Sequence, residues 1–188
     1  LEVLLSQMVS LLKGGEPYKM SKRAGNVILM SDITNDIGSD ALRFVFLTKK
    51  SDTHLEFDLD RLTNQDSSNP IFYINYAHAR INQVFKKAEL TFDDIKDESF
   101  ENLNQDGLNL IYESLLLGSV LNEAFAKREM QKITEYLTSL AASIHKFYND
   151  YKIVGSTEQN MYLKALSMSA MSIRVGLDLL GIKAKDKM

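Results

Sequence analysis

Residues 69–81 read Asn-Pro-Ile-Phe-Tyr-Ile-Asn-Tyr-Ala-His-Ala-Arg-Ile, and this stretch decides the kind of fold that the chain adopts. Its apolar residues recur every three to four positions, the spacing that places side chains on one face of an α-helix. The stripe consists of Ile71, Ile74, Ala77 and Ile81, and it continues through Val84, Phe85 and Ala88. The pattern predicts a long amphipathic helix that begins near residue 70 and buries one face.

Three stretches further along the chain show the same helical period. They run from Leu110 to Leu121, from Ile133 to Tyr148 and from Met161 to Leu180. A polar segment, residues 91–107, separates the first long helix from the second, and we find no functional motif in residues 91–132. Long amphipathic helices joined by short links predict an antiparallel bundle.

The residues before the first long helix follow a different pattern. Residues 3–12 resemble a strand, and the glycine pair that follows favours a hairpin turn. Residues 31–38 and 39–47 favour two short helices, whereas residues 55–59 alternate between apolar and acidic side chains like a half-buried strand. We predict a mainly α fold. An antiparallel helical bundle over residues 63–188 would follow a small α/β connecting subdomain with a β-hairpin over residues 1–62.

Composition narrows the classes of protein that fit. The 188 residues are 45% hydrophobic and 25% charged, which is typical of a globular protein. The chain has no cysteine and three scattered histidines, so we expect no metal site. No apolar run is long enough to span a membrane, and a net charge of −3 argues against coating of nucleic acid by bulk positive charge. We expect a cytoplasmic monomer that does not bind membranes.

Residues 19–26 read Lys-Met-Ser-Lys-Arg-Ala-Gly-Asn and combine three cations with a hydroxyl, a glycine and an amide. Cations that approach the phosphates late contribute more to phosphoryl chemistry than cations that only bind the substrate. A loop that contains glycine can close in this way. The composition therefore favours a polyphosphate-binding loop, and the alternative is a solvated basic turn after the hairpin.

Tyr73, Tyr76 and Arg80 lie on one face of the first long helix, because their spacing is three and four residues. Two phenols and a guanidinium on one face form a platform for unstacked bases, which proteins bind by stacking and by hydrogen bonds to base edges. The alternative is that both tyrosines flank the bundle core. We expect the nearby His78 to be a hydrogen-bonded structural histidine.

The octapeptide resembles the KMSKS signature of class I aminoacyl-tRNA synthetases, and the form KMSKRAGN is most similar to that of the arginyl enzymes. The resemblance implies that Lys19 and Lys22 are catalytic and supply positive charge to the phosphates of ATP, which is bound with Mg²⁺. Met20 would pack the loop against the protein and Ser21 would add hydrogen bonds. Arg23 stands where the commonest signature has serine, and it would belong to the same ATP-binding loop.

Two further segments carry the resemblance. Residues 40–43 spell DALR, the name given to the anticodon-binding domain of this group of synthetases, and residues 69–81 are similar to the matching segment of the arginyl enzymes. In that family, positions that match Tyr73, Tyr76 and Arg80 contact nucleotides of the anticodon loop. The C-terminal residue, here Met188, lies beside the anticodon. The resemblance therefore implies an arginine-accepting tRNA as the partner.

A class I synthetase also needs a nucleotide-binding domain and a HIGH-like motif, neither of which is found in this sequence. The chain begins at Leu1 rather than at methionine, so we expect it to be the C-terminal part of a longer ligase that uses ATP and L-arginine. The isolated chain should bind no cofactor and should neither activate nor transfer arginine.

Two other interpretations stay open at this stage. The chain could come from another class I synthetase, such as the cysteinyl enzyme, because the DALR-type helical domain is shared within the group. It could also be a non-catalytic helical interaction module with an incidental basic turn. The first alternative predicts a different tRNA, and the second predicts no affinity for RNA.

Overall fold

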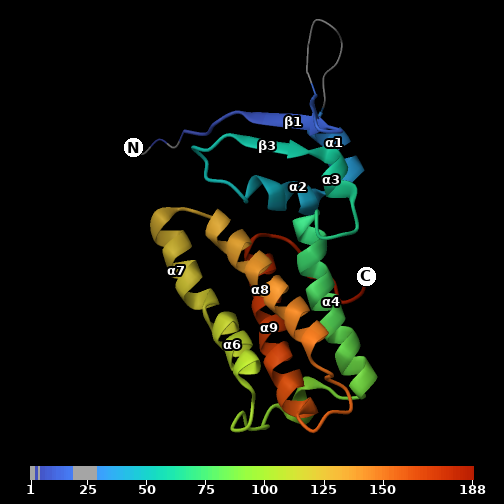
Figure 1. The fold of residues 1–188 in the computed structure, drawn as a ribbon. Helices are drawn as coiled ribbons and strands as arrows, with labels where there is room; N and C mark the ends of the chain where they lie inside the picture. The colour runs from blue at the N-terminus through green and yellow to red at the C-terminus, as the bar shows by residue number, and fades with distance from the viewer. Residues whose placement is uncertain (1–2, 4, 19–28) are drawn as a thin grey trace, which may run out of the picture.

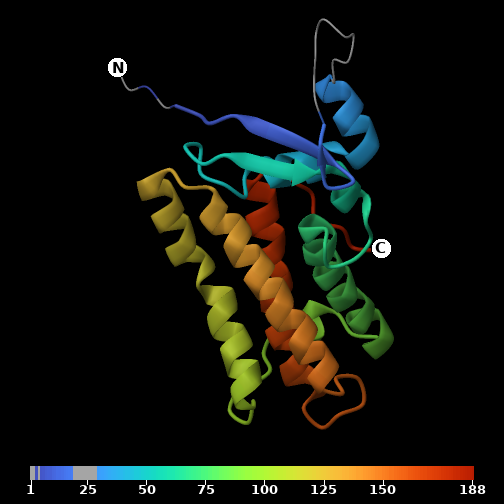
Figure 2. The ribbon, with the colours of Figure 1, turned by 45° about the horizontal axis from the view of Figure 1, so that its top comes forward.

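The computed structural model describes residue 3 and the ranges 5–18 and 29–188. A small sheet with three short helices lies across one end of a bundle of long helices (Figures 1 and 2). The strands are β1 (Val9–Lys13), β2 (Glu16–Pro17) and β3 (Leu55–Asp58), and the helices of this layer are α1 (Met30–Ile37), α2 (Ser39–Phe46) and α3 (Leu59–Thr63). The mainly α fold predicted from the sequence is confirmed, including the β-hairpin and the strand near residue 55.

The sheet has the order β2-β1-β3. The predicted hairpin pairs β1 with β2 in antiparallel fashion, and its turn uses Gly14 and Gly15, both with positive φ angles that glycine adopts without strain. Strand β3 pairs with β1 in parallel, with Val9 opposite Leu55. Parallel pairing needs a crossover, and α1 and α2 provide it.

The bundle contains α4 (Pro70–Ala88), α6 (Gln105–Leu115), α7 (Leu117–Lys127), α8 (Gln131–Asp150) and α9 (Gln159–Leu179), with the short α5 (Phe92–Ile95) in the link after α4. Helices α4 and α8 run away from the sheet, whereas α6, α7 and α9 return toward it (Figure 1). The stretch that we predicted as one helix around residues 110–121 forms two helices, because the backbone tightens at Leu116. There the amide of Leu116 donates to the Glu113 carbonyl, three residues back.

Helix α2 belongs to two hydrophobic cores. Ala41 and Phe44 pack into the bundle core, whereas Leu42 and Val45 pack into a second core beneath the sheet. Each pair is spaced three residues apart, so the helix presents one apolar stripe to each side. The DALR segment therefore has a structural function at this junction.

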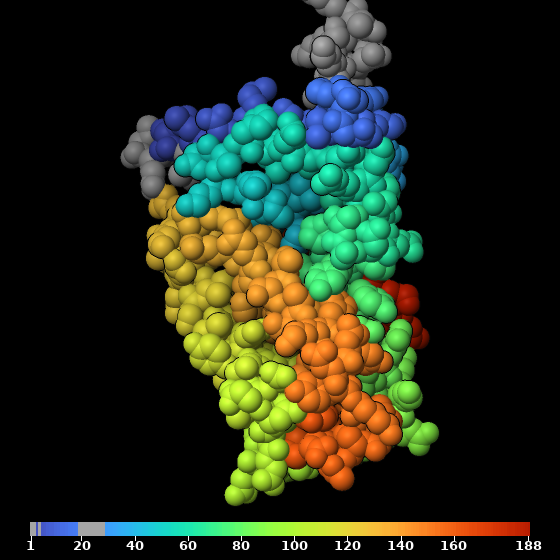
Figure 3. Space-filling view, viewed as in Figure 1, coloured from blue at the N-terminus to red at the C-terminus, as the bar shows by residue number. Residues whose placement is uncertain are grey.

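The chain continues past α9 as a tail that lies against α4 (Figure 3). Ile182 is buried in the bundle core. The tail turns at Gly181, whose φ angle is 71°. A Cβ atom added at Gly181 would lie 3.4 Å from a guanidinium nitrogen of Arg43, so the arginine of the DALR segment lies where the tail leaves α9.

Two glycines in the bundle helices allow a matched test of this packing. A Cβ on Gly176 in α9 would lie 2.7 Å from a methyl carbon of the fully buried Leu137, whereas a Cβ on Gly118 in α7 would meet no atom of the described residues within 4 Å. We expect Gly176→Ala to lower the free energy of unfolding by about 1–3 kcal/mol through overpacking. Gly118→Ala should raise it by up to about 1 kcal/mol through helix propensity.

Urea denaturation of both variants tests this difference. Equal gains in the free energy of unfolding would contradict the close approach of α9 to α8.

Candidate nucleic-acid interface

Five side chains from α4 and α8 form one cluster. The guanidinium carbon of Arg80 lies 3.8 Å from the ring centre of Tyr148 and 5.4 Å from that of Tyr76. Cations at such distances are attracted to the negative faces of aromatic rings. Tyr73, Tyr76, Arg80, His145 and Tyr148 are called the Arg80 cluster below. The predicted trio on α4 is thus brought together, and α8 completes the group.

His145 lies at the centre of the Arg80 cluster. Its ring centre is 4.5 Å from that of Tyr73 and 5.4 Å from that of Tyr76, and the second pair is stacked. Arg80 donates a hydrogen bond to Nδ1 of His145 at 3.3 Å, and Nε2 of the same ring lies 3.2 Å from the Tyr73 carbonyl oxygen. Burial, reinforced by the positive charge of Arg80, lowers the pKa of His145 from its ordinary value.

The residues of the trio differ in exposure. Tyr73 is half-buried and packs against the bundle core, whereas 40% of Tyr76 is exposed. Tyr73 therefore partly fits the alternative interpretation, in which both tyrosines flank the bundle core. Tyr76 also stacks on Phe72, with ring centres 6.1 Å apart, so the aromatic surface continues one turn toward the start of α4.

The sequence reasoning missed His145 and Tyr148. The two residues are three positions apart on α8, so they share a face, just as Tyr73 and Tyr76 do on α4. The three-residue spacing on α8 is the sequence signal that could have identified the pair. It does not show that α8 packs against α4, because Arg80 and His145 lie on separate helices, 65 positions apart in the sequence.

The tail brings Met188 near the same helix. The backbone amide of Lys185 donates to the Asn75 side chain at 2.9 Å, and Nδ1 of His78 lies 3.0 Å from the Lys185 carbonyl oxygen. Asp186 approaches Arg174 at 3.4 Å. His78 is thus the hydrogen-bonded structural histidine that we expected, and burial lowers its pKa.

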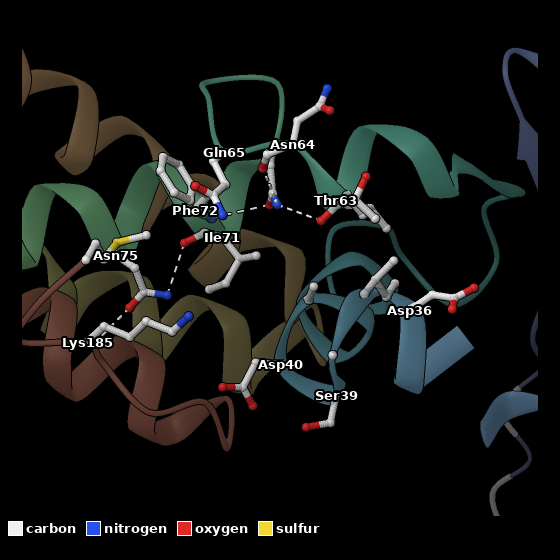
Figure 4. Close-up of a pocket in the computed structure, with 16 residues that line it drawn as sticks. Asp36, Ser39, Asp40, Thr63, Asn64, Gln65, Ile71, Phe72, Asn75 and Lys185 are labelled. Atoms are coloured by element: carbon white, nitrogen blue, oxygen red, sulfur yellow. Dashed lines mark hydrogen bonds between the residues drawn. The ribbon is translucent and has the colours of Figure 1, made fainter. Parts of the chain in front are cut away.

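A cavity of about 400 Å³ lies between the tail, α4 and the helices of the sheet layer. Met188 lines it together with Phe72, Asn75 and Lys185, and 45% of Met188 is exposed. Figure 4 shows Asn75 and Lys185 on the α4 side, while Asp36 lies on the α1 side. Because Phe72 lines this cavity and also stacks on Tyr76, the cavity adjoins the Arg80 cluster.

The predicted phosphate loop lies outside the described residues, so Lys19, Met20, Ser21, Lys22 and Arg23 have no placement here. Its flanks are described: Tyr18 follows β2, and Leu29 donates its backbone amide to Asp32 at the start of α1. In the described ranges, no three histidine, aspartate or glutamate side chains gather as a metal site would require. None of the helices described there is long and apolar enough to cross a membrane.

The long helices form an antiparallel bundle that carries the Arg80 cluster on α4 and α8. A sequence model of the DALR anticodon binding domain matches residues 74–188. The chain belongs to this family. The arginine–tRNA ligase of Aliarcobacter butzleri is 80% identical over all 188 residues, and that of Campylobacter jejuni strain RM1221 is 61% identical over the same length. The chain spans 36% of the length of these relatives.

Solved structures agree with this assignment. An arginyl-tRNA synthetase structure from Campylobacter jejuni superimposes with a TM-score of 0.94 at 59% identity, over 100% of this chain and 41% of that one. The Thermus thermophilus arginyl-tRNA synthetase superimposes with a TM-score of 0.73 over 95% of this chain and 34% of that one. At 20% identity the second likeness concerns the fold alone. The resemblance to arginyl-tRNA synthetases drawn from the sequence is thereby confirmed.

The buried histidines should make the fold sensitive to acid. The pKa values of His78 and His145 lie below the ordinary 6.5, so the unfolded chain binds protons more readily than the folded chain. Their contribution to stability is complete above pH 6.5 and is lost as the pH falls through the folded pKa values. Each histidine contributes a slope of at most about 1.4 kcal/mol per pH unit.

Urea denaturation from about pH 7.5 to about pH 5.5 measures this dependence. His145→Leu should give a shallower slope than the unsubstituted chain. An identical slope would contradict the lowered pKa of His145.

Proposed function

We propose that this chain binds the anticodon loop of an arginine-accepting tRNA through the Arg80 cluster. The observation that carries the proposal is the position of the Arg80 guanidinium, which lies over Tyr148 and close to the half-exposed Tyr76. Unstacked bases bind to aromatic faces and to guanidinium planes, and the guanidinium can also donate to base edges or phosphates.

The donors of Arg80 support a role in RNA binding. One N–H group bonds to His145, and within the part of the chain that the structure describes the guanidinium makes no ion pair. Its charge is therefore not neutralised by a carboxylate. An anionic partner would meet a cation that is already held in place, which lowers the entropic cost of binding.

Met188 and its cavity extend this proposed surface. The bonds from Asn75 and His78 to the tail hold the last residues beside α4. Phe72 connects the cavity to the Arg80 cluster, so a base that stacks near Tyr76 would lie within reach of the cavity mouth. We therefore propose that Met188 makes an apolar contact with a nucleotide of the same loop.

The rest of the proposal concerns a longer protein. We propose that the chain acts within an arginine–tRNA ligase, where Lys19 and Lys22 stabilise the phosphates of ATP, bound with Mg²⁺, while L-arginine is activated. Met20, Ser21 and Arg23 would complete that loop. The division into residues 1–62 and 63–188, a monomeric state and a cytoplasmic location belong to the same proposal. The high identity to arginine–tRNA ligases supports the ligase part of this proposal.

Substitutions in the Arg80 cluster test RNA binding. We expect Tyr76→Ala to weaken binding of an RNA hairpin with the anticodon loop of an arginine-accepting tRNA by about 1–3 kcal/mol, because one stacking face is lost. Arg80→Lys should also weaken it, since lysine keeps the charge but lacks the planar fork. The matched control is Tyr112→Ala, which removes a 66% exposed tyrosine from α6.

Fluorescence anisotropy with labelled RNA measures these affinities, and circular dichroism checks the fold. If Tyr76→Ala binds as the Tyr112→Ala control does, Tyr76 makes no contact with the RNA.

Comparison of binding to two anticodon hairpins tests which tRNA the chain recognises. We expect the chain to bind the anticodon hairpin of an arginine-accepting tRNA more tightly than that of a cysteine-accepting tRNA. The isolated chain should not catalyse arginine-dependent exchange between pyrophosphate and ATP. Equal binding of both hairpins, or no binding of either, would overturn the proposed recognition of an arginine-accepting tRNA by this chain. Exchange activity would contradict the division of functions proposed above.

A further inference from the structure

The orientation of Arg80 depends on a hydrogen-bond acceptor inside the protein. Two aromatic rings attract the guanidinium, but attraction to a ring face fixes the position of a cation better than its rotation within the plane. The hydrogen bond from an Arg80 N–H to Nδ1 of His145, at 3.3 Å, fixes that rotation. His145 is 7% exposed, so it acts on the RNA face from beneath and not by touching the RNA itself.

The neighbours of His145 determine its tautomer. An arginine can only donate, so Nδ1 must carry a lone pair. A backbone carbonyl can only accept, so Nε2, which lies 3.2 Å from the Tyr73 carbonyl oxygen, must carry the proton. Only the neutral ring protonated at Nε2 satisfies both contacts, and a second proton would occupy the lone pair on which Arg80 depends.

We propose that His145 is a positioning residue which, as the neutral Nε2–H tautomer, holds the Arg80 guanidinium in the orientation that reads RNA, and which releases it when protonated. The inference rests on the proposed function of the Arg80 cluster. It assigns to the RNA site a form of regulation: acid weakens the site although no residue that touches RNA changes its charge.

The groups around His145 favour this behaviour. Helix α4 presents Arg80 with the rings of Tyr73 and Tyr76, and Tyr148 lies on the other side of Arg80. Within the ranges that the structure describes, Arg80 is the one charged side chain that acts on His145, and no carboxylate there contributes to the shift of its pKa. A protonated ring would therefore place two cations 3.3 Å apart without a counter-ion.

The sign of the pH dependence of RNA binding distinguishes this proposal from a simple effect of charge. RNA is an anion, so a histidine that acted only by its charge would strengthen RNA binding when it gained a proton. Release of Arg80 predicts the reverse, because the guanidinium loses its fixed geometry. The loss should be roughly tenfold in the dissociation constant, which is the usual effect of one hydrogen bond to a charged group.

The test combines two substitutions with a pH series. His145→Asn keeps an acceptor near the position of Nδ1 on a side chain that does not titrate, whereas His145→Leu fills the space without an acceptor. Dissociation constants for the anticodon hairpin are measured between about pH 8 and about pH 5. Binding by the unsubstituted chain should weaken progressively as the pH falls below 6.5, toward a loss of roughly tenfold once His145 is protonated. His145→Leu should be weak throughout, and His145→Asn should recover affinity with a profile much flatter than that of the unsubstituted chain, because His78 still titrates in it.

Some binding results would overturn the proposal. One is a pH profile of the unsubstituted chain that is as flat as that of His145→Asn. The others are binding that strengthens in acid, and equal affinities of the Asn and Leu variants.

Nitrogen NMR of the same chain without RNA separates this inference from the proposed function. The ¹⁵N shifts of His145 report the tautomer directly, and the guanidinium signals of Arg80 should move as His145 titrates. An Nδ1–H tautomer would overturn the inference even if RNA binds. If the NMR results are as expected but the chain binds no RNA, the positioning of Arg80 stands and the proposed function fails.

Discussion

Helix α4 contacts the bundle core, the C-terminal tail and α8, and a different part of its surface faces each of them. Ile74 and Ala77 are fully buried in the bundle core, which fixes the rotation of the helix about its axis. With that rotation fixed, Asn75 and His78 must face the tail, while Tyr76 and Arg80 must face outward toward α8. A slip of one residue would turn every side chain by about 100°, so the buried stripe determines where both proposed RNA-binding surfaces lie.

The position of this bundle relative to the sheet layer depends on α2. Because Phe44 packs into the bundle core and Val45 into the sheet core, neither core is complete without this helix. Lys50 adds an ion pair to Glu129 near the start of α8, with a distance of 2.6 Å between the charged groups. A single ion pair whose lysine is half-exposed contributes little energy, so the apolar contacts of α2 hold the two layers together.

The sequence predicts what depends on local spacing. The stripe of α4 and the shared face of Tyr73, Tyr76 and Arg80 follow from the period of the helix, and the turn at Gly14 and Gly15 follows from glycine. The positions of His145 and Tyr148 in the Arg80 cluster cannot be predicted in this way, because they depend on α8 packing beside α4. Periodicity shows which face of a helix is buried but not which helix packs against it. The tail is missed for a similar reason. Its attachment uses backbone groups of Lys185, whose contacts leave no pattern in the sequence.

If the chain binds RNA as proposed, a net charge of −3 requires that the attraction be local. A carboxylate beside Arg80 would hold the guanidinium firmly, but it would also cancel the charge that an RNA phosphate is to meet. Two aromatic faces and a neutral imidazole hold Arg80 without neutralising it. The hydrogen bond of His145 replaces the orienting effect of an ion pair while the positive potential stays directed outward. In the proposed mechanism this arrangement makes RNA binding depend on the protonation of a buried histidine. A carboxylate of ordinary pKa would stay ionised near neutral pH and would introduce no such dependence.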